Sequence, residues 1–259
     1  MIAKDNSRAS ESGHWYDRET GEPRYSVIGK NGKERNTTLR DAKATGSLVP
    51  SVTTVIRMAA SPGLEAWKQQ QVLLASLTLP RLDNEPEDVW IDRIMMDSKE
   101  TGKKAAERGT AIHAGVQAHY EGKDAGIYLP HAKATEEAIR AYFGEKKWEP
   151  EVSFSHGGFG GKCDLMARPN GTDKGLVVDV KTKEFTDPDK VSAFDEHLMQ
   201  LSAYRIGFQM PQARCANVFV SVQEPVKIKI VEWTEDDLQR GWAMFSSLLN
   251  FWQIKNNYR

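Results

Sequence analysis

The sequence contains only two cysteines, Cys163 and Cys215, among its 259 residues. Two cysteines cannot build a framework of several disulfides, and they cannot supply the four thiolates of a structural zinc site or an iron–sulfur cluster. We therefore expect no iron–sulfur cluster. The same scarcity of cysteine predicts a reducing compartment, and we expect a cytoplasmic location.

Long hydrophobic runs are also absent. No stretch approaches the roughly 18 consecutive apolar residues of a membrane span, and the first twenty residues hold no apolar signal core. Neither sign of charge is in excess, since 35 lysines and arginines stand against 36 acids, for a net charge of -1. We expect no membrane contact, and any contact with nucleic acid must come from a local basic patch.

What the sequence does contain is enough apolar material for a core, because 39% of its residues are hydrophobic and 27% are charged. At roughly 150 residues per domain, the length suggests one or two domains, and one elaborated domain is the preferred interpretation. Residues 1–24 are polar and lack hydrophobic periodicity, which predicts a flexible N-terminal arm. Residues 25–259 then form a single domain.

The two parts of this domain have different hydrophobic patterns. Residues 25–145 are mainly of helical character, and residues 146–259 alternate short strand patterns with helices. This order predicts an α/β fold, with a central mixed β-sheet flanked by helices and an N-terminal helical elaboration. Helices are expected at 52–60, 64–79, 98–120, 132–143, for about 20 residues ending near 208, and from 234 to 255; strands are expected at 25–28, 151–155, 160–167, 176–182, 216–222 and 226–232.

Among four acid-x-Lys triplets in the chain, only Asp179-Val180-Lys181 ends an apolar run. The period of two in a strand directs Asp179 and Lys181 to the same face. Burying either charge alone costs several kcal/mol, so both need partners. A salt bridge at a strand end is one explanation of this triplet, and a reactive site is the other.

A second acid, Asp164, lies on the preceding strand. The Asn170-Gly171 turn pairs the two strands antiparallel, so Asp164 and Asp179 can lie side by side. Adjacent carboxylates repel unless a proton or a cation lies between them, and Mg²⁺ or Mn²⁺ suits such oxygen ligands. Lys181 could orient a metal-bound water or neutralise charge on a phosphate. The pattern predicts phosphodiester hydrolysis.

Two helical patterns allow both a structural and a functional reading. A lone helical histidine such as His113 is more often a packing residue, although it could also bind the same metal. His197, Gln200 and Tyr204 follow i, i+3, i+7 spacing and share one helix face. That face is either a polar exposed stripe or a group that binds a phosphate or positions the attacking water.

Four short motifs occur in a fixed order: GTAIHA at 109–114, GGKCDL at 160–165, VVDVKT at 177–182 and HLMQLSAY at 197–204. Together they resemble the RecB-type branch of the PD-(D/E)XK nuclease superfamily. PSVTT at 50–54 and LEAWK at 64–68 resemble the start of the mitochondrial genome maintenance exonucleases and their phage-encoded relatives.

This resemblance covers roughly residues 49–233 and implies a restriction-endonuclease-like core. It also implies Mg²⁺- or Mn²⁺-dependent hydrolysis of DNA, often from a free single-stranded end, in replication, recombination or repair. The location would be the host cytoplasm if the protein is phage-encoded. By position, the resemblance implies metal ligands at His113, Asp164, Asp179, the Val180 carbonyl and, for a second metal, Glu151, and catalytic roles for Asp164, Asp179, Lys181, Gln200 and Tyr204.

Residues outside this core are candidates for DNA binding. The helical part, 25–145, would form the substrate channel, although solvated charge and core packing explain the same residues. An endonuclease or junction resolvase on the same fold, and a non-catalytic nucleic-acid binding protein, are the alternative functions. The DNA-binding candidates are Ser51, Trp67, Lys103, Lys104 and Arg108.

Overall fold

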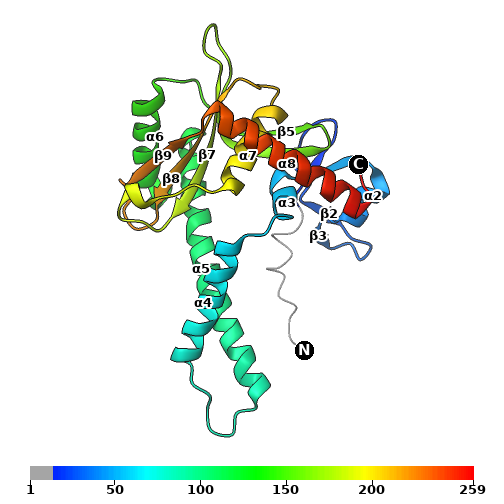
Figure 1. Ribbon diagram of the computed structural model, residues 1–259, viewed down its shortest axis with the longest axis vertical. Coiled ribbons are helices and arrows are strands. Elements are labelled where there is room, and N and C mark those ends of the chain that lie inside the picture. Colours follow the sequence, from blue (N-terminus) through cyan, green and yellow to red (C-terminus); the bar gives the residue numbers. More distant parts are fainter. Residues whose placement is uncertain (1–13) are drawn as a thin grey trace.

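The computed structural model describes residues 14–259, and within this part of the chain five strands form one mixed sheet in the order β5-β6-β7-β8-β9. Neighbouring strands are antiparallel except β7 and β8, which are parallel. Helices cover both faces of the sheet (Figure 1), so the predicted α/β fold is confirmed. The strands are β5 (Glu149–His156), β6 (Phe159–Ala167), β7 (Leu176–Lys183), β8 (Arg214–Ser221) and β9 (Ile228–Glu232).

The sheet separates two hydrophobic cores. Val178 of β7 belongs to the core beneath α5 (Glu87–Tyr120) and α6 (Leu129–Phe143). Its neighbour Val177 belongs to the core beneath α3 (Val52–Ile56), α7 (Asp195–Gly207) and α8 (Glu235–Asn256). Because successive side chains of a strand point to opposite faces, β7 is buried on both sides, which explains its uninterrupted apolar run.

The first described residues, from residue 14 onward, pack against the C-terminal helix α8. The sequence predicted a flexible arm through residue 24; residues 1–13 of it lie outside the described residues, and the rest of that prediction is wrong. Trp15–Asp17 form β1, which pairs antiparallel with β4 (Leu48–Pro50). The Trp15 ring is buried and packs edge-on against Trp252 of α8. A second hairpin joins β2 (Ser26–Ile28) to β3 (Glu34–Asn36), followed by α2 (Leu39–Thr45).

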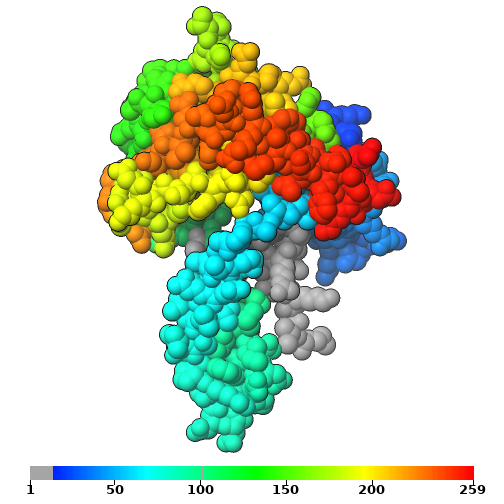
Figure 2. Space-filling view, viewed as in Figure 1, coloured from blue at the N-terminus to red at the C-terminus, as the bar shows by residue number. Residues whose placement is uncertain are grey.

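Residues 62–103, which we call the arm, project from the body of the molecule (Figures 1 and 2). The arm consists of α4 (Pro62–Thr78) and the first half of α5, joined by a loop. Helix α5 begins at Glu87, earlier than the predicted residue 98. The negative charges of Glu87 and Asp88 in its first turn stabilise this start, because the N-terminal end of a helix dipole is positive. No helix of the described residues is long and apolar enough to cross a bilayer.

Helix α7 is shorter than the sequence predicted. It has 13 residues, and a 3₁₀ turn at Pro188–Lys190 (η2) precedes it. Helix α7 begins after Phe194, whose backbone N–H donates to Nδ1 of His197 at 3.0 Å. This hydrogen bond satisfies one of the free donors at the helix start. A 3₁₀ turn at Gly126–Tyr128 (η1) likewise precedes α6.

Candidate active site

Strands β6 and β7 part beside a pair of aspartates. The strands pair antiparallel, as predicted, with Leu165 opposite Val178, and their pairing ends there. Asp164 and Asp179 are the next residues in this register. Beyond this point the backbone N–H of Val180 donates to Oδ2 of Asp164 at 2.6 Å. The carboxylate of Asp164 thus replaces a sheet partner at the end of the ladder.

Glu151 of β5 continues this row of acids. The pairs on either side of it, Pro150 with Leu165 and Val152 with Cys163, leave Glu151 opposite Asp164. Its φ of 56° is left-handed, a conformation that costs a non-glycine residue about 1–2 kcal/mol. Glu151 also forms an ion pair with Lys162 of β6. The backbone strain therefore lies at an acidic residue of the candidate site.

His113 reaches the same place from α5. Its Nε2 lies 3.1 Å from Oδ1 of Asp164. One ligand atom each of His113, Glu151 and Asp164 lie within 4.8 Å of one another, so a single ion could contact all three. An imidazole nitrogen with two carboxylate oxygens fits Mg²⁺ or Mn²⁺. Val180, the predicted carbonyl ligand, lines the same narrow pocket.

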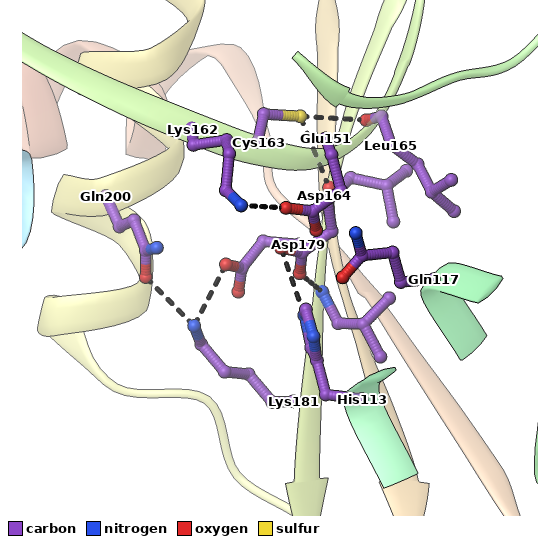
Figure 3. A network of polar contacts seen from close by, with 12 residues as sticks. His113, Gln117, Glu151, Lys162, Cys163, Asp164, Leu165, Asp179, Lys181 and Gln200 are labelled. Carbon is purple, nitrogen blue, oxygen red and sulfur yellow. Dashed lines mark hydrogen bonds and ion pairs between the residues drawn. The ribbon is translucent and has the colours of Figure 1, made fainter. Parts of the chain in front are cut away.

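Asp179 is held on both of its carboxylate oxygens, and Figure 3 shows the contact with Lys181. Lys181 Nζ donates to its Oδ1 at 2.9 Å, and Asn217 Nδ2 of β8 donates to its Oδ2 at 2.9 Å. Trp233 Nε1 in turn donates to Asn217 Oδ1 at 2.8 Å. Asp179 lies outside the cluster of three ligand atoms, and its role as a metal ligand stays a prediction.

Gln200 and Tyr204 of α7 complete the network. Lys181 Nζ donates to Oε1 of Gln200 at 3.1 Å, and Gln200 Nε2 donates to the Tyr204 hydroxyl at 2.9 Å. Gln200 and Tyr204 are only 8% and 4% exposed, so the interpretation of this helix face as a polar exposed stripe is wrong. The amide of Gln200 fixes the position of the lysine ammonium group.

The ionisable side chains of the site shift one another's pKa values. Burial raises the pKa of Asp164, but the hydrogen bond and charge of His113 outweigh this effect and leave the pKa below its usual value. Burial raises the pKa of Asp179, and the ammonium group of Lys181 offsets the shift only in part. Burial alone would lower the pKa values of His113 and Lys181, yet the neighbouring carboxylates raise both. The carboxylates therefore favour the protonated forms of both His113 and Lys181.

Three residues near the site have no counterpart among the predicted ones. Asn217 binds Asp179, Lys162 pairs with Glu151, and Gln117 of α5 lines the pocket beside His113. The sequence offered one indication of Asn217, because it is a lone polar residue within the apolar run that forms β8. In the structure its side chain is fully buried. Such a residue must find a hydrogen-bond partner.

The predicted DNA-binding residues lie in three places. Ser51 is 3% exposed, and its hydroxyl accepts from the Thr54 N–H at the start of α3. Arg108 donates to the Val222 carbonyl at 2.7 Å and so ties α5 to the end of β8. The others belong to α4 and α5: Trp67 is 39% exposed, Lys103 lies near Glu107, and Lys104 pairs with Glu100 at 2.8 Å. DNA binding by all five stays a prediction.

Comparisons with known proteins found resemblance only among solved structures. No protein-family model matches the chain, and no curated protein matches its sequence. A candidate exonuclease from Eubacterium rectale has 14% identity and a TM-score of 0.41, covering 58% of this chain and 68% of its own. An alkaline exonuclease from Laribacter hongkongensis has 13% identity and a TM-score of 0.30, covering 48% of this chain and 68% of its own. The likeness is too weak to assign an activity to this chain.

Proposed function

We propose that this protein is a metal-dependent deoxyribonuclease that hydrolyses phosphodiester bonds. The observation that carries the proposal is the convergence of His113, Glu151 and Asp164 on one point, beside the buried Asp179 and its half-buried partner Lys181. Clustered carboxylates with an imidazole favour a divalent cation, and a lysine beside them favours an anionic substrate. A phosphodiester combines both requirements.

The residues divide the work as follows. His113, Glu151 and Asp164 would hold the ion, with Asp179 and the Val180 carbonyl as further ligands. The bound ion would supply Lewis-acid stabilisation of a phosphate and a more acidic water. Lys181 faces the site with an ammonium group that Gln200 orients, and it stabilises negative charge as it builds on the phosphate.

The substrate class in this proposal is DNA, attacked from a free end of a single strand in the presence of Mg²⁺ or Mn²⁺. The order of the sequence motifs supports the nuclease assignment and the preference for an end. Lys103 and Lys104 are exposed on α5, the helix that carries His113, and could contact the phosphates of a strand that approaches the site. Exonuclease action in replication, recombination or repair follows from this assignment.

The test compares end-labelled linear single-stranded DNA with a covalently closed single-stranded circle, each with Mg²⁺, Mn²⁺ or a chelator. We expect metal-dependent loss of the linear strand and survival of the circle. An Asp164→Asn variant serves as the matched control for contaminating nuclease. Cleavage of the circle would replace the exonuclease with an endonuclease or resolvase, and binding of DNA without cleavage in any metal would leave only a nucleic-acid binding protein.

A further inference from the structure

The arm exposes large apolar side chains in unusual number. Ten of the 18 exposed large hydrophobic residues among the described residues lie on it. Leu77 is 80% exposed and Leu73 is 65% exposed, although each lies within a regular helix. The largest exposed apolar patch of a typical monomer covers about 300–600 Å² and is often functional. The arm therefore requires an explanation beyond chance exposure.

Six of these ten side chains gather on one side of the arm. The Trp67 ring lies against Gly102, and Trp90 Nε1 donates to the Leu79 carbonyl at 2.8 Å, which fixes how α4 and α5 align. With this alignment and a period of 3.6 residues, the outward side chains of both helices form one strip. We call this strip the apolar flank; it consists of Trp67, Leu73, Leu74, Leu77, Ile91 and Met95.

The charge of the arm opposes DNA as the occupant of this flank. Residues 62–103 contain eight acids and five bases, for a net charge of -3. A net negative charge does not attract a phosphate backbone along the flank, and Lys103 at the base of the arm stays the candidate for phosphate contact. Five of the six side chains of the flank are aliphatic or thioether groups, whereas single-stranded nucleic acid is bound by stacking on aromatic rings.

The charges at the two ends of the flank are complementary to each other. Asp88 lies near the tip of the arm and Lys99 lies near its base, on the side of α5 that carries Ile91 and Met95. Both side chains are exposed, and neither forms an ion pair within residues 14–259. Met95 lies close to the midpoint between them. A twofold axis near Met95 would bring Asp88 of one copy to Lys99 of another.

We propose that the apolar flank is a homodimer interface, on which the arm of a second copy packs antiparallel to form a four-helix bundle. Helix α4 has 17 residues and is about 25 Å long, so two such arms can bury an area on the order of the 800 Å² per partner of a standard interface. The arm projects from the body (Figure 2), so an antiparallel pair of arms would carry one body at each end of the bundle. The interface is isologous, because the same residues serve on both copies.

The first test measures the oligomeric state of the full chain by sedimentation velocity across a concentration series. We expect a concentration-dependent dimer for the natural sequence and a monomer for the Leu74→Glu/Leu77→Glu variant. Met96→Glu is the matched control, because Met96 is 71% exposed on another side of α5 and its substitution should leave the dimer intact. Circular dichroism confirms that each variant is folded.

The second test is a charge reversal. Asp88→Lys and Lys99→Asp should each raise the dimer dissociation constant more than about tenfold, and the double variant should restore it, because only antiparallel self-pairing joins these two positions. A chain that stays monomeric throughout the series overturns the proposal. So does a double variant that is not restored, or a Met96→Glu variant that weakens the dimer equally. A natural chain that stays monomeric, together with loss of single-strand binding in the Leu74→Glu/Leu77→Glu variant, would make DNA the occupant instead.

Discussion

Asp164 and Lys181 lie in the same network but have different partners, so their substitutions should have different effects. Asp164→Asn removes a charge from the centre of the ligand cluster, and we expect metal affinity to fall by at least about tenfold. Lys181→Met leaves the three converging ligand atoms in place, and we expect metal affinity to be kept while kcat falls roughly 10²- to 10³-fold. Calorimetric Mn²⁺ titration and single-turnover cleavage measure the two effects.

Lys183→Met provides the control for loss of a positive charge on β7, because Lys183 lies over the Phe194 ring and outside the network. Its cleavage rate should stay close to that of the natural sequence. If Lys181→Met weakens Mn²⁺ as strongly as Asp164→Asn does, the lysine supports the metal site itself and the separation of roles is wrong.

We expect the lowered pKa of His197 to reduce the stability of the protein in acid. Burial lowers its pKa to about 4, and the charges of Lys181 and Lys183 add to the shift. Below the usual histidine pKa of about 6.5 the unfolded chain binds a proton that the folded chain excludes. This group therefore has no effect on stability above pH 6.5, and it lowers the free energy of unfolding as the pH falls from 6.5 toward 4, by roughly 2–3 kcal/mol in total.

A glutamine at this position can accept the same N–H hydrogen bond from Phe194 but does not titrate. Urea unfolding of the natural sequence and of His197→Gln at several pH values isolates the contribution of this histidine. We expect the difference in unfolding free energy between the two proteins to change between pH 6.5 and pH 4 and to be constant above. A difference that does not vary with pH would show that His197 is protonated equally in both states.

The sequence could predict those site residues whose positions follow from local periodicity. Asp179 and Lys181 share a strand face, and the Asn170-Gly171 turn brings Asp164 beside them. Asn217 could not be placed, because its contact with Asp179 depends on the parallel pairing of β7 with β8, a non-local arrangement. Convergence of His113 on Asp164 likewise depends on how α5 crosses the sheet, which no local pattern encodes.

At the scale of elements, α7 is held in a slot formed by close contacts at three glycines. A Cβ atom on Gly161 of β6 would lie 2.6 Å from Cε1 of Tyr204, and one on Gly241 of α8 would lie 2.4 Å from Oγ of Ser202. The last residue of α7, Gly207, lies against the Phe154 ring of β5. These contacts let α7 approach the sheet closely enough for Gln200 to reach Lys181.

Gly207→Ala should therefore destabilise the protein, although alanine is the better helix former. The new Cβ atom would lie 1.9 Å from Cε2 of Phe154, a buried ring that packs against Phe159 and Tyr204 and cannot easily move. We expect a loss of about 1–3 kcal/mol, as for other overpacked cores. Denaturant unfolding measures this loss.

The control for this change is Gly63→Ala in α4, where no atom lies within 4 Å of the added Cβ. Helix propensity alone should make that variant neutral or up to about 1 kcal/mol more stable. If both glycine variants gain stability, the close approach of α7 to β5 is not a constraint. The sequence predicted α7 as an element, but its length and its glycine contacts depend on packing against β5, β6 and α8.

At the scale of the whole molecule, Tyr258 packs onto β1, β4 and α2, which we call the N-terminal lobe. The Tyr258 hydroxyl lies 2.6 Å from the Leu48 carbonyl and 3.2 Å from the Ala42 carbonyl, and its ring packs edge-on against Trp15. Tyr258→Phe should lower the free energy of unfolding by about 0.5–1.5 kcal/mol, the usual net contribution of a hydrogen bond, without changing Mn²⁺ affinity.

Tyr128→Phe is the control, because its hydroxyl makes no hydrogen bond within the described residues, and its removal should leave stability unchanged. Amide hydrogen exchange should show faster opening of β1 and β4 in Tyr258→Phe than in the control. Equal exchange in β1 and β4 would mean that the Tyr258 hydroxyl does not secure the lobe.

The same contact has a consequence for synthesis on the ribosome. The Leu48 carbonyl accepts a hydrogen bond from Tyr258, which lies 210 positions later in the chain. Strands β1 and β4 therefore leave the ribosome long before Tyr258 has been synthesised. Long-range contacts of this kind form late, and apolar side chains such as Trp15 are accessible to chaperones and proteases in the interval. Asn217 likewise follows Asp179 by 38 positions, so the network around Asp179 cannot form before β8 has emerged. A chain whose translation stalls before residue 258 therefore leaves the N-terminal lobe without the contact between Tyr258 and Leu48.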